Sequence, residues 1–282
     1  MTPGAGGVQA SGDVAMSPDT ALPSLHAPPS WRCIDFISDL HLHESHPRTF
    51  EAFQRFLRGT RADAVFILGD LFEAWVGDDM RHQPFEAACT AELAAAGARL
   101  DLHLMVGNRD FLLGAEMARA CNASLLSDPT VLQAFDQRHV LSHGDAWCLD
   151  DTAYQAFRAQ SRSDAWQARF LAQPLPARLA AAKAMREASE SQKHGMRQED
   201  WADLAPQAVA DALVAAAAAV LVHGHTHRPA SEPFARPGAQ RHVLSDWDLD
   251  HAPYRAQVMR LSASGYHRLS IDEALAAPTG QA

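Results

Sequence analysis

The chain has 282 residues, which is enough for one large domain or for one domain with an insertion. Its net charge of −10 at pH 7 does not favour a nucleic-acid partner. The four cysteines are scattered without a C-x-x-C pair, so we expect reduced thiols rather than a disulfide framework or a zinc ribbon. The longest apolar run, Ala212 to Val222, is far shorter than the roughly 20 residues of a transmembrane helix.

The first 30 residues are rich in Gly, Ala, Pro and Ser and have neither the basic nor the apolar region of a secretory signal. This composition predicts a disordered extension over residues 1–30. We expect the folded domain over residues 31–270 and a C-terminal tail over residues 271–282.

The first predicted strand lies within Arg32–Leu42 and carries Asp39 and His41 near its end. Alternate residues of an extended segment point the same way, so both side chains can reach one ion. A helix is predicted next, because apolar side chains recur there at helical spacing: Phe50, Phe53, Phe56 and Leu57.

Four further apolar segments end at polar residues in the same way. They are Val65–Leu68 with Asp70, Leu100–Val106 with Asn108, His139–Ser142 with His143, and Ala219–Val222 with His225 and His227. A helix over Phe85 to Leu93, closed by Gly97, separates two of them. Alternating strands and helices predict an α/β fold with one shared ligand edge. Later strands, His242–Leu244 and Gln257–Leu261, are expected to add a second sheet and complete a sandwich.

A long insertion, at about residues 151–206, precedes the last of these five strands and is helical by composition. Trp166, Phe170 and Leu171 form one apolar face. Basic residues outnumber acidic ones in it: Arg158, Arg162, Arg169, Arg178, Lys183, Arg186, Lys193 and Arg197. Two interpretations are open, a solvated helix face or a lid that meets an anionic, apolar ligand or a membrane surface.

The residues at the strand ends form a mixed nitrogen and oxygen donor set: Asp39, His41, Asp70, Asn108, His143, His225 and His227. Such a set suits Mn²⁺, Fe²⁺ or Zn²⁺ and lacks the thiolates of a structural zinc site. Seven ligands are too many for one tetrahedral ion, but they suit two ions that share a carboxylate. Two ions about 4 Å apart polarise a phosphoryl group and activate water. The sequence therefore predicts hydrolysis of a phosphate ester or anhydride.

Five motifs in chain order resemble the calcineurin-like metallophosphoesterase superfamily: D-x-H at 39–41, G-D at 69–70, G-N-x-D at 107–110, H-G-D at 143–145 and G-H-T-H at 224–227. Longer stretches resemble its UDP-2,3-diacylglucosamine hydrolase family, which belongs to the lipid A pathway of Gram-negative bacteria: residues 38–42, 67–79, 107–114, 150–158 and 223–229. The resemblance covers about residues 33 to 260. It implies a two-sheet αββα sandwich with a helical lid insertion.

The resemblance also implies two Mn²⁺ ions and the side chains that hold them. One ion would be held by Asp39, His41 and His227, and the other by Asn108, His143 and His225, with Asp70 bridging both. The family cleaves the pyrophosphate of UDP-2,3-diacylglucosamine at the α-phosphorus, releasing UMP and 2,3-diacylglucosamine 1-phosphate. The implied catalytic residues are Asp70, Arg109 and His225.

Arg109 stands where many members of the superfamily carry a histidine that can protonate an alkoxide leaving group. Arginine cannot act as an acid at neutral pH, but it can stabilise charge on a phosphate. A phosphate monoester, with a second pKa near about 6, needs charge stabilisation more than a proton when it leaves. Arg109 therefore favours anhydride cleavage, with a structural salt bridge to Asp110 as the alternative.

Carried over by position, the substrate contacts are Asn108, Arg109, Asp151, Ser189, Lys193 and His225. The match is weaker in the insertion, where some relatives have Asn in place of Lys193 and where residues 203–209 lack the usual Asp-Val-Asn. Apolar lid residues would line an acyl groove, and basic ones would favour anionic lipid. We expect a peripheral protein on the cytoplasmic face of the inner membrane, without an obligate protein partner.

Two alternatives to this function remain open. A soluble phosphodiesterase or nucleotide phosphatase of the same superfamily would cleave bis-p-nitrophenyl phosphate as well as the lipid and would not respond to detergent. A metal-dependent binding scaffold would show no turnover, although the intact ligand set argues against it.

Overall fold

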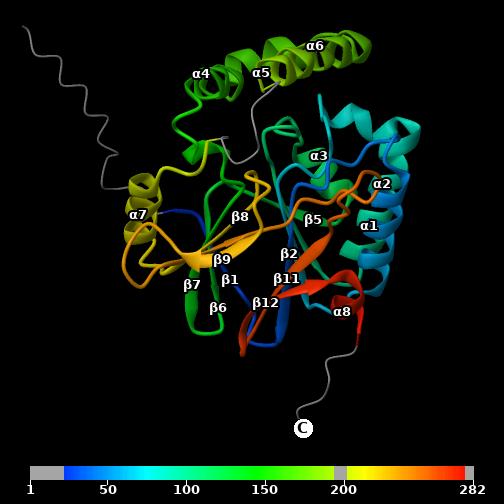
Figure 1. The fold of residues 1–282 in the computed structure, drawn as a ribbon. Helices are drawn as coiled ribbons and strands as arrows, with labels where there is room; N and C mark the ends of the chain where they lie inside the picture. The colour runs from blue at the N-terminus through cyan, green and yellow to red at the C-terminus, as the bar shows by residue number, and fades with distance from the viewer. Residues whose placement is uncertain (1–21, 194–201, 277–282) are drawn as a thin grey trace, which may run out of the picture.

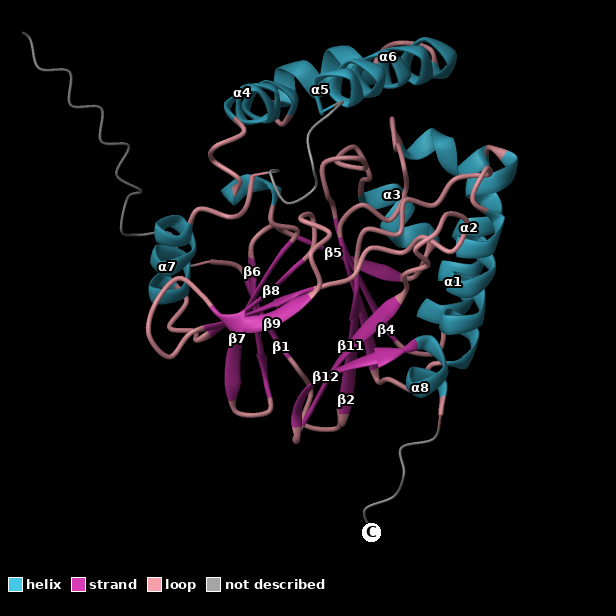
Figure 2. Cartoon of the chain, viewed as in Figure 1, coloured by secondary structure: helices cyan, strands magenta, loops and turns pink. Residues whose placement is uncertain are grey.

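The computed structural model of the chain describes residues 22–193 and 202–276. Two six-stranded sheets pack face to face, and helices cover their outer sides (Figure 1). The colouring by secondary structure shows the strands as an inner double layer between helices (Figure 2). The predicted αββα sandwich is confirmed.

One sheet has the strand order β12-β11-β2-β3-β4-β5. Its members are β2 (Cys33–Ile37), β3 (Ala64–Leu68), β4 (Asp101–Met105), β5 (Ala123–Leu126), β11 (Gln257–Ser262) and β12 (Gly265–Ser270). The run from β2 to β5 is parallel, whereas β11 pairs antiparallel with both β2 and β12.

The other sheet has the order β1-β6-β7-β8-β10-β9. Its members are β1 (Ser24–His26), β6 (Thr130–Ala134), β7 (Gln137–Ser142), β8 (Val220–His223), β9 (Ala230–Pro233) and β10 (Gln240–Val243). β7, β8 and β10 run parallel to one another, and a tight antiparallel hairpin joins β6 to β7.

The five strands that deliver the predicted ligands are divided between the two sheets. β2, β3 and β4 lie in one sheet and β7 and β8 in the other, so the prediction of a single sheet edge is wrong. The two late strands also fail to form a second sheet of their own, because β10 pairs with β8 and β11 with β2. Apolar content marks each strand, but pairing depends on contacts between segments far apart in the chain.

The central strands are continuous apolar runs in the sequence because they are buried in the core on both faces. β3 is buried on both faces at all five positions, between the other sheet and the helices. Among the helices, α1 (Pro47–Gly59) buries Phe53, Phe56 and Leu57, which confirms the helical spacing. The remaining helices of the sandwich are α2 (Pro84–Gly97), α3 (Ala115–Ala120) and α7 (Pro206–Ala215), with 3-10 turns η1 (Asp78–His82) and η2 (Asp145–Trp147).

Both predicted chain ends contain more structure than expected. Ser24–His26 forms β1, which pairs parallel with β6, so the predicted disordered extension is wrong for residues 22–30. Ile271–Leu275 forms α8, which begins with a Ser270–Glu273 capping box and buries Ile271, so the tail prediction is wrong there. Residues 1–21 and 277–282 lie outside the described residues. Short strands and short helices carry too little periodicity to be found by pattern alone.

The insertion contains the helices α4 (Thr152–Ser161), α5 (Asp164–Leu171) and α6 (Leu175–Lys193). They lie across the end of the sandwich at which the ligand strands terminate (Figure 1). Within the described part of the chain, no helix is both long and apolar enough to cross a membrane.

Candidate active site

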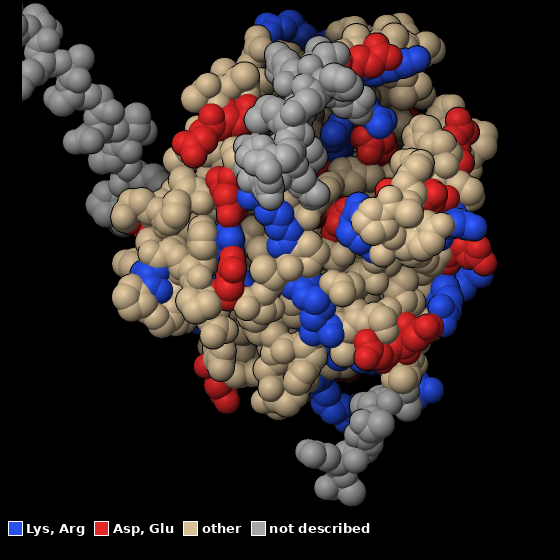
Figure 3. All heavy atoms as spheres, viewed as in Figure 1, with Lys and Arg blue, Asp and Glu red and all other residues tan. Residues whose placement is uncertain are grey.

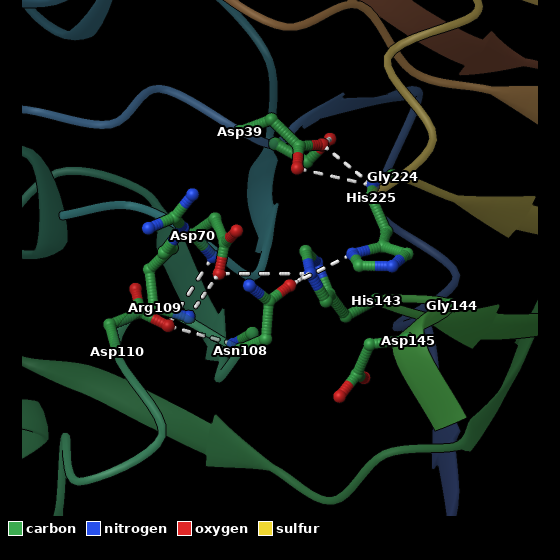
Figure 4. Close-up of polar contacts among 12 residues, drawn as sticks. Asp39, Asp70, Asn108, Arg109, Asp110, His143, Gly144, Asp145, Gly224 and His225 are labelled. Carbon is green, nitrogen blue, oxygen red and sulfur yellow. Dashed lines mark hydrogen bonds and ion pairs between the residues drawn. The ribbon is translucent and has the colours of Figure 1, made fainter. Parts of the chain in front are cut away.

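The seven predicted ligands follow the ends of β2, β3, β4, β7 and β8. Figure 4 shows Asp39, Asp70, Asn108, His143 and His225 gathered at one site. Asn108 Oδ1 lies 3.0 Å from His143 Nε2 and 2.8 Å from His225 Nδ1. On the other side of the site, His227 Nε2 lies 3.3 Å from Asp39 Oδ1 and 3.3 Å from His41 Nε2. Both implied sets of ligands therefore exist as compact groups.

Asp70 lies between these two groups. Its Oδ1 is 3.7 Å from His143 Nε2, and its Oδ2 is 3.9 Å from His41 Nε2. The backbone N–H of Arg109 donates to Asp70 Oδ1 at 2.8 Å and fixes the carboxylate. The two oxygens thus face different groups of donors, as a bridging ligand requires.

The backbone at the ligands adopts a conformation that non-glycine residues rarely take. Five of the seven have φ between 47° and 65°: Asp39, His41, Asp70, His225 and His227. Such strain persists only where the surrounding structure fixes it, and it concentrates at functional sites. Repetition at five ligands indicates that the backbone is shaped to aim these side chains.

Three motif glycines lie directly against ligand side chains. A Cβ at Gly107 would stand 2.1 Å from Asp70 Oδ1, and one at Gly224 would stand 2.3 Å from Asp39 Oδ2. At Gly69 a Cβ would stand 2.4 Å from His143 Nδ1. The glycines in these motifs are therefore required by space.

The charges of the site favour a cation. Burial opposes the protonation of His143, but Asp70 and Asp39 outweigh it and raise the pKa of His143 to about 9. Burial likewise opposes ionisation of Asp39, but His227 outweighs it and holds the pKa of that carboxyl well below its usual range. A negative potential that attracts a proton this strongly also attracts a metal ion. Two groups of side chains could each hold one: Asp39, His41 and His227, and Asp39, Asp70 and His143.

Comparison with known proteins agrees with this geometry. The calcineurin-like phosphoesterase family matches residues 34–229. The chain is 42% identical over 241 residues to the UDP-2,3-diacylglucosamine hydrolase of Stenotrophomonas maltophilia, covering 82% of this chain and 95% of that protein. The chain belongs to the UDP-2,3-diacylglucosamine hydrolase family.

Two further members of the UDP-2,3-diacylglucosamine hydrolase family show the same extent of similarity. The protein of Xanthomonas campestris pv. campestris is 44% identical over 240 residues, covering 82% of this chain and 95% of its own. That of Ralstonia nicotianae is 47% identical over 239 residues, covering 80% and 88%. Family membership and the donor set together make this protein a hydrolase with a divalent-metal site.

Within this hydrolase family fold, Arg109 pairs with a residue that the sequence did not single out. Its Nη1 lies 3.5 Å from Glu73 Oε1. Asp110, the partner considered from the sequence, is fully buried and accepts backbone N–H donors of Gly107 at 2.7 Å and Leu71 at 2.8 Å. Asp110 therefore joins the loops after β3 and β4, and the Arg109 side chain remains directed at the site (Figure 4).

Asp145 is a second residue whose role the sequence did not reveal. It is fully buried, and its Oδ2 accepts from Arg158 Nε at 2.8 Å and from the Tyr154 hydroxyl. Arg162 of the following turn donates to the Gly107 carbonyl at 2.8 Å. The beginning of the insertion is thus attached to the loops that carry the ligands.

Several basic residues of the insertion pair with carboxylates of the sandwich. Besides Arg158, Arg178 is nearly fully buried and pairs with Asp79, while Arg186 Nη1 lies 3.1 Å from Glu73 Oε1. For Arg158 and Arg178 a solvated helix face is wrong, because each guanidinium pairs with a carboxylate of the sandwich. The alternative of a lid that meets an anionic, apolar ligand or a membrane surface stays a prediction. Lys183 remains exposed.

The predicted substrate contacts in the insertion are less well defined. Asp151 Oδ1 accepts from the Tyr154 N–H at 3.0 Å and caps α4. Ser189 and Lys193 belong to the end of α6, where the side chains lie outside the described part of the structure. Their contacts with substrate stay predictions.

Proposed function

We propose that this protein hydrolyses the pyrophosphate bond of UDP-2,3-diacylglucosamine in lipid A biosynthesis, giving UMP and 2,3-diacylglucosamine 1-phosphate (lipid X). One observation carries the proposal. The polar ends of five strands from two sheets meet at one site in a chain that is 42% to 47% identical to hydrolases of that name.

We propose two Mn²⁺ ions at the site. Asp39, His41 and His227 would hold one, and Asn108, His143 and His225 the other, with Asp70 between them. Ions bound there supply a Lewis acid for the phosphoryl oxygen and a lowered pKa for water. Gly69, Gly107 and Gly224 pack directly against ligand side chains, and this close packing keeps the donor atoms in place.

Arg109 is proposed to stabilise the phosphate that leaves. Its backbone N–H donates to Asp70, whereas its side chain lies beside the site and is 29% exposed. A guanidinium stays charged at every pH relevant to the reaction. The side chain can therefore bind the developing phosphate monoester dianion but cannot protonate an alkoxide.

The insertion is proposed to cover the lipid part of the substrate, with Asp151, Ser189 and Lys193 at the sugar and phosphate. Leu171, Leu179 and Met185 are 42%, 37% and 36% exposed on it. Acidic and basic side chains are interspersed on the face drawn in Figure 3. The exposed apolar side chains of the insertion are proposed to make the contact with lipid. We propose peripheral association with the cytoplasmic face of the inner membrane.

Hydrolysis in water labelled with oxygen-18 tests the proposed position of attack. Attack at the α-phosphorus places the label in UMP, and mass spectrometry of both products reads this out. Label in lipid X would show that the wrong phosphorus is assigned. Turnover of bis-p-nitrophenyl phosphate at a matching kcat/KM, without any effect of detergent, would instead favour a soluble phosphodiesterase.

A further inference from the structure

Glu73 contacts three side chains that belong to different parts of the site. It follows β3 and is 7% exposed. Its Oε2 lies 3.1 Å from His41 Nδ1, and its Oε1 lies 3.5 Å from Arg109 Nη1 and 3.1 Å from Arg186 Nη1. These partners come from the segment after β2, the loop after β4 and helix α6 of the insertion.

The contact with His41 puts Glu73 in the place of an outer partner of a metal ligand. His41 Nε2 faces the donor group, 3.3 Å from His227 Nε2, so its Nδ1 points the other way, towards Glu73. Metal-binding histidines usually give the proton of their second nitrogen to such a carboxylate, which fixes tautomer and ring orientation. The approach is oblique, and His41 Nδ1 has no aligned acceptor among the described residues.

The contact with the two arginines connects the insertion to the reacting centre. Glu73 is nearly buried, whereas the side chains of Arg109 and Arg186 are 29% and 40% exposed. The carboxylate is therefore a fixed point from which both guanidiniums extend. Because a carboxylate aligns guanidinium groups directionally, both cations are held towards an anionic substrate.

We infer that Glu73 is a positioning residue, which sets the ring of His41 for metal binding through Oε2 and orients Arg109 and Arg186 towards the substrate phosphates through Oε1. This inference rests on the proposed function, because it assumes a metal site and a phosphate substrate. A structural counter-charge would be the simpler role, and it makes different predictions.

The metal part of the inference is tested without substrate. Calorimetric titration of chelator-stripped protein with Mn²⁺ should show that Glu73→Gln weakens binding by about 10- to 100-fold. Glu92→Gln, which alters a carboxylate paired with Arg58 on the surface of α1 and α2, should bind as the unchanged protein does. Glu73→Asp keeps the charge but loses reach, so positioning predicts weak binding for it as well. Wild-type affinity in Glu73→Asp would overturn the inference, because a structural counter-charge needs only the retained charge; wild-type affinity in Glu73→Gln would overturn it as well.

The substrate part is tested by a double-mutant cycle on kcat/KM for UDP-2,3-diacylglucosamine. Glu73→Gln and Arg186→Gln should each lower kcat/KM, and the double variant should lose much less than the product of the two losses. Arg186→Gln should leave Mn²⁺ affinity unchanged. This control excludes a general loss of folding, because misfolded protein would also bind Mn²⁺ more weakly. Independent, multiplicative losses would refute the link between these residues. Absence of UMP release by the unchanged protein would refute the proposed function and leave the Mn²⁺ result standing.

Discussion

At the scale of single residues, the placement of the proposed metal ligands depends on neighbouring glycines. Gly107, Gly224 and Gly69 lie so close to Asp70, Asp39 and His143 that any Cβ would overlap a ligand atom. Asp39 and Asp70 have left-handed φ values, so the backbone turns sharply at each residue and directs its carboxylate into the site. Glycine and ligand therefore act together at each strand end.

Gly107→Ala should move Asp70 and lower activity by on the order of 100-fold, because displacement of a catalytic group by about 1 Å has that effect. Mn²⁺ titration should show weaker binding in the same variant. Gly59→Ala is the control, since its Cβ would meet only the movable end of Leu275, with Cδ2 at 2.9 Å. Equal activity of Gly107→Ala and Gly59→Ala would contradict the steric role of Gly107.

The sequence predicted the ligands because each stands beside a glycine or another ligand at the end of an apolar run. It could not predict Glu73, Asp110 or Asp145 as parts of the site. These acids are defined by partners distant in the chain, such as Arg186 for Glu73 and Arg158 for Asp145. Asp110 and Asp145 lie inside the G-N-x-D and H-G-D motifs, but the motifs alone do not show what these carboxylates contact.

At the scale of elements, an ion pair with a fully buried carboxylate links β2 to its neighbour β11 within the sheet. Asp35 of β2 is fully buried and accepts from Arg260 of β11, with Nε at 2.7 Å and Nη2 at 2.8 Å. Thr60, which follows α1, donates to the same carboxylate at 2.7 Å. This contact fixes the strand that delivers Asp39 and His41.

Arg260→Met should lower the free energy of unfolding by about 3–5 kcal/mol, because it leaves the Asp35 charge buried without its partner. Chemical denaturation measures the change. Arg58→Met removes an exposed ion pair with Glu92 and should change stability by less than about 1 kcal/mol. A loss in Arg260→Met no larger than that in Arg58→Met would contradict the role given to the buried pair.

The long apolar strands and α1 could be predicted element by element, but β1, β5, β6, β9 and β12 could not. β5 and β9 contain no buried position, so they lack the buried apolar run by which β3 is recognised. β1 has three residues and depends on β6 for its backbone hydrogen bonds. The helices of the insertion could be predicted from composition. Their attachment to the sandwich through Arg158, Arg178 and Arg186 could not, because these ion pairs join segments that only the folded chain brings together.

At the scale of the whole molecule, the active site exists because two sheets pack face to face with their ligand-bearing strand ends at the same end of the sandwich. The same packing buries histidines that take no part in the site. His103 on β4 stacks on Phe66 with ring centroids 4.3 Å apart, and neither ring nitrogen has a hydrogen-bond partner among the described residues. Burial lowers the pKa of His103 to about 4.

His103 should make the fold less stable as the pH falls. Its pKa is lower in the folded than in the unfolded chain, so between about pH 6.5 and 4 the unfolded chain binds more protons. Stability therefore falls through that window, by up to about 1.4 kcal/mol per pH unit from this residue. Melting curves of His103→Phe should show a gain over the unchanged protein that grows from pH 7 to pH 5. A gain that stays constant with pH would show that His103 does not titrate as described.

Manganese-dependent release of UMP from UDP-2,3-diacylglucosamine tests most directly whether this site performs the proposed hydrolysis. Chelator-stripped protein should be inactive, and Mn²⁺ should restore release of UMP and lipid X. Asp70→Ala should abolish release, whereas Asp211→Ala, on the exposed face of α7, should retain it. Failure of the Mn²⁺-loaded protein to release UMP, or full activity of Asp70→Ala, would contradict the assignment.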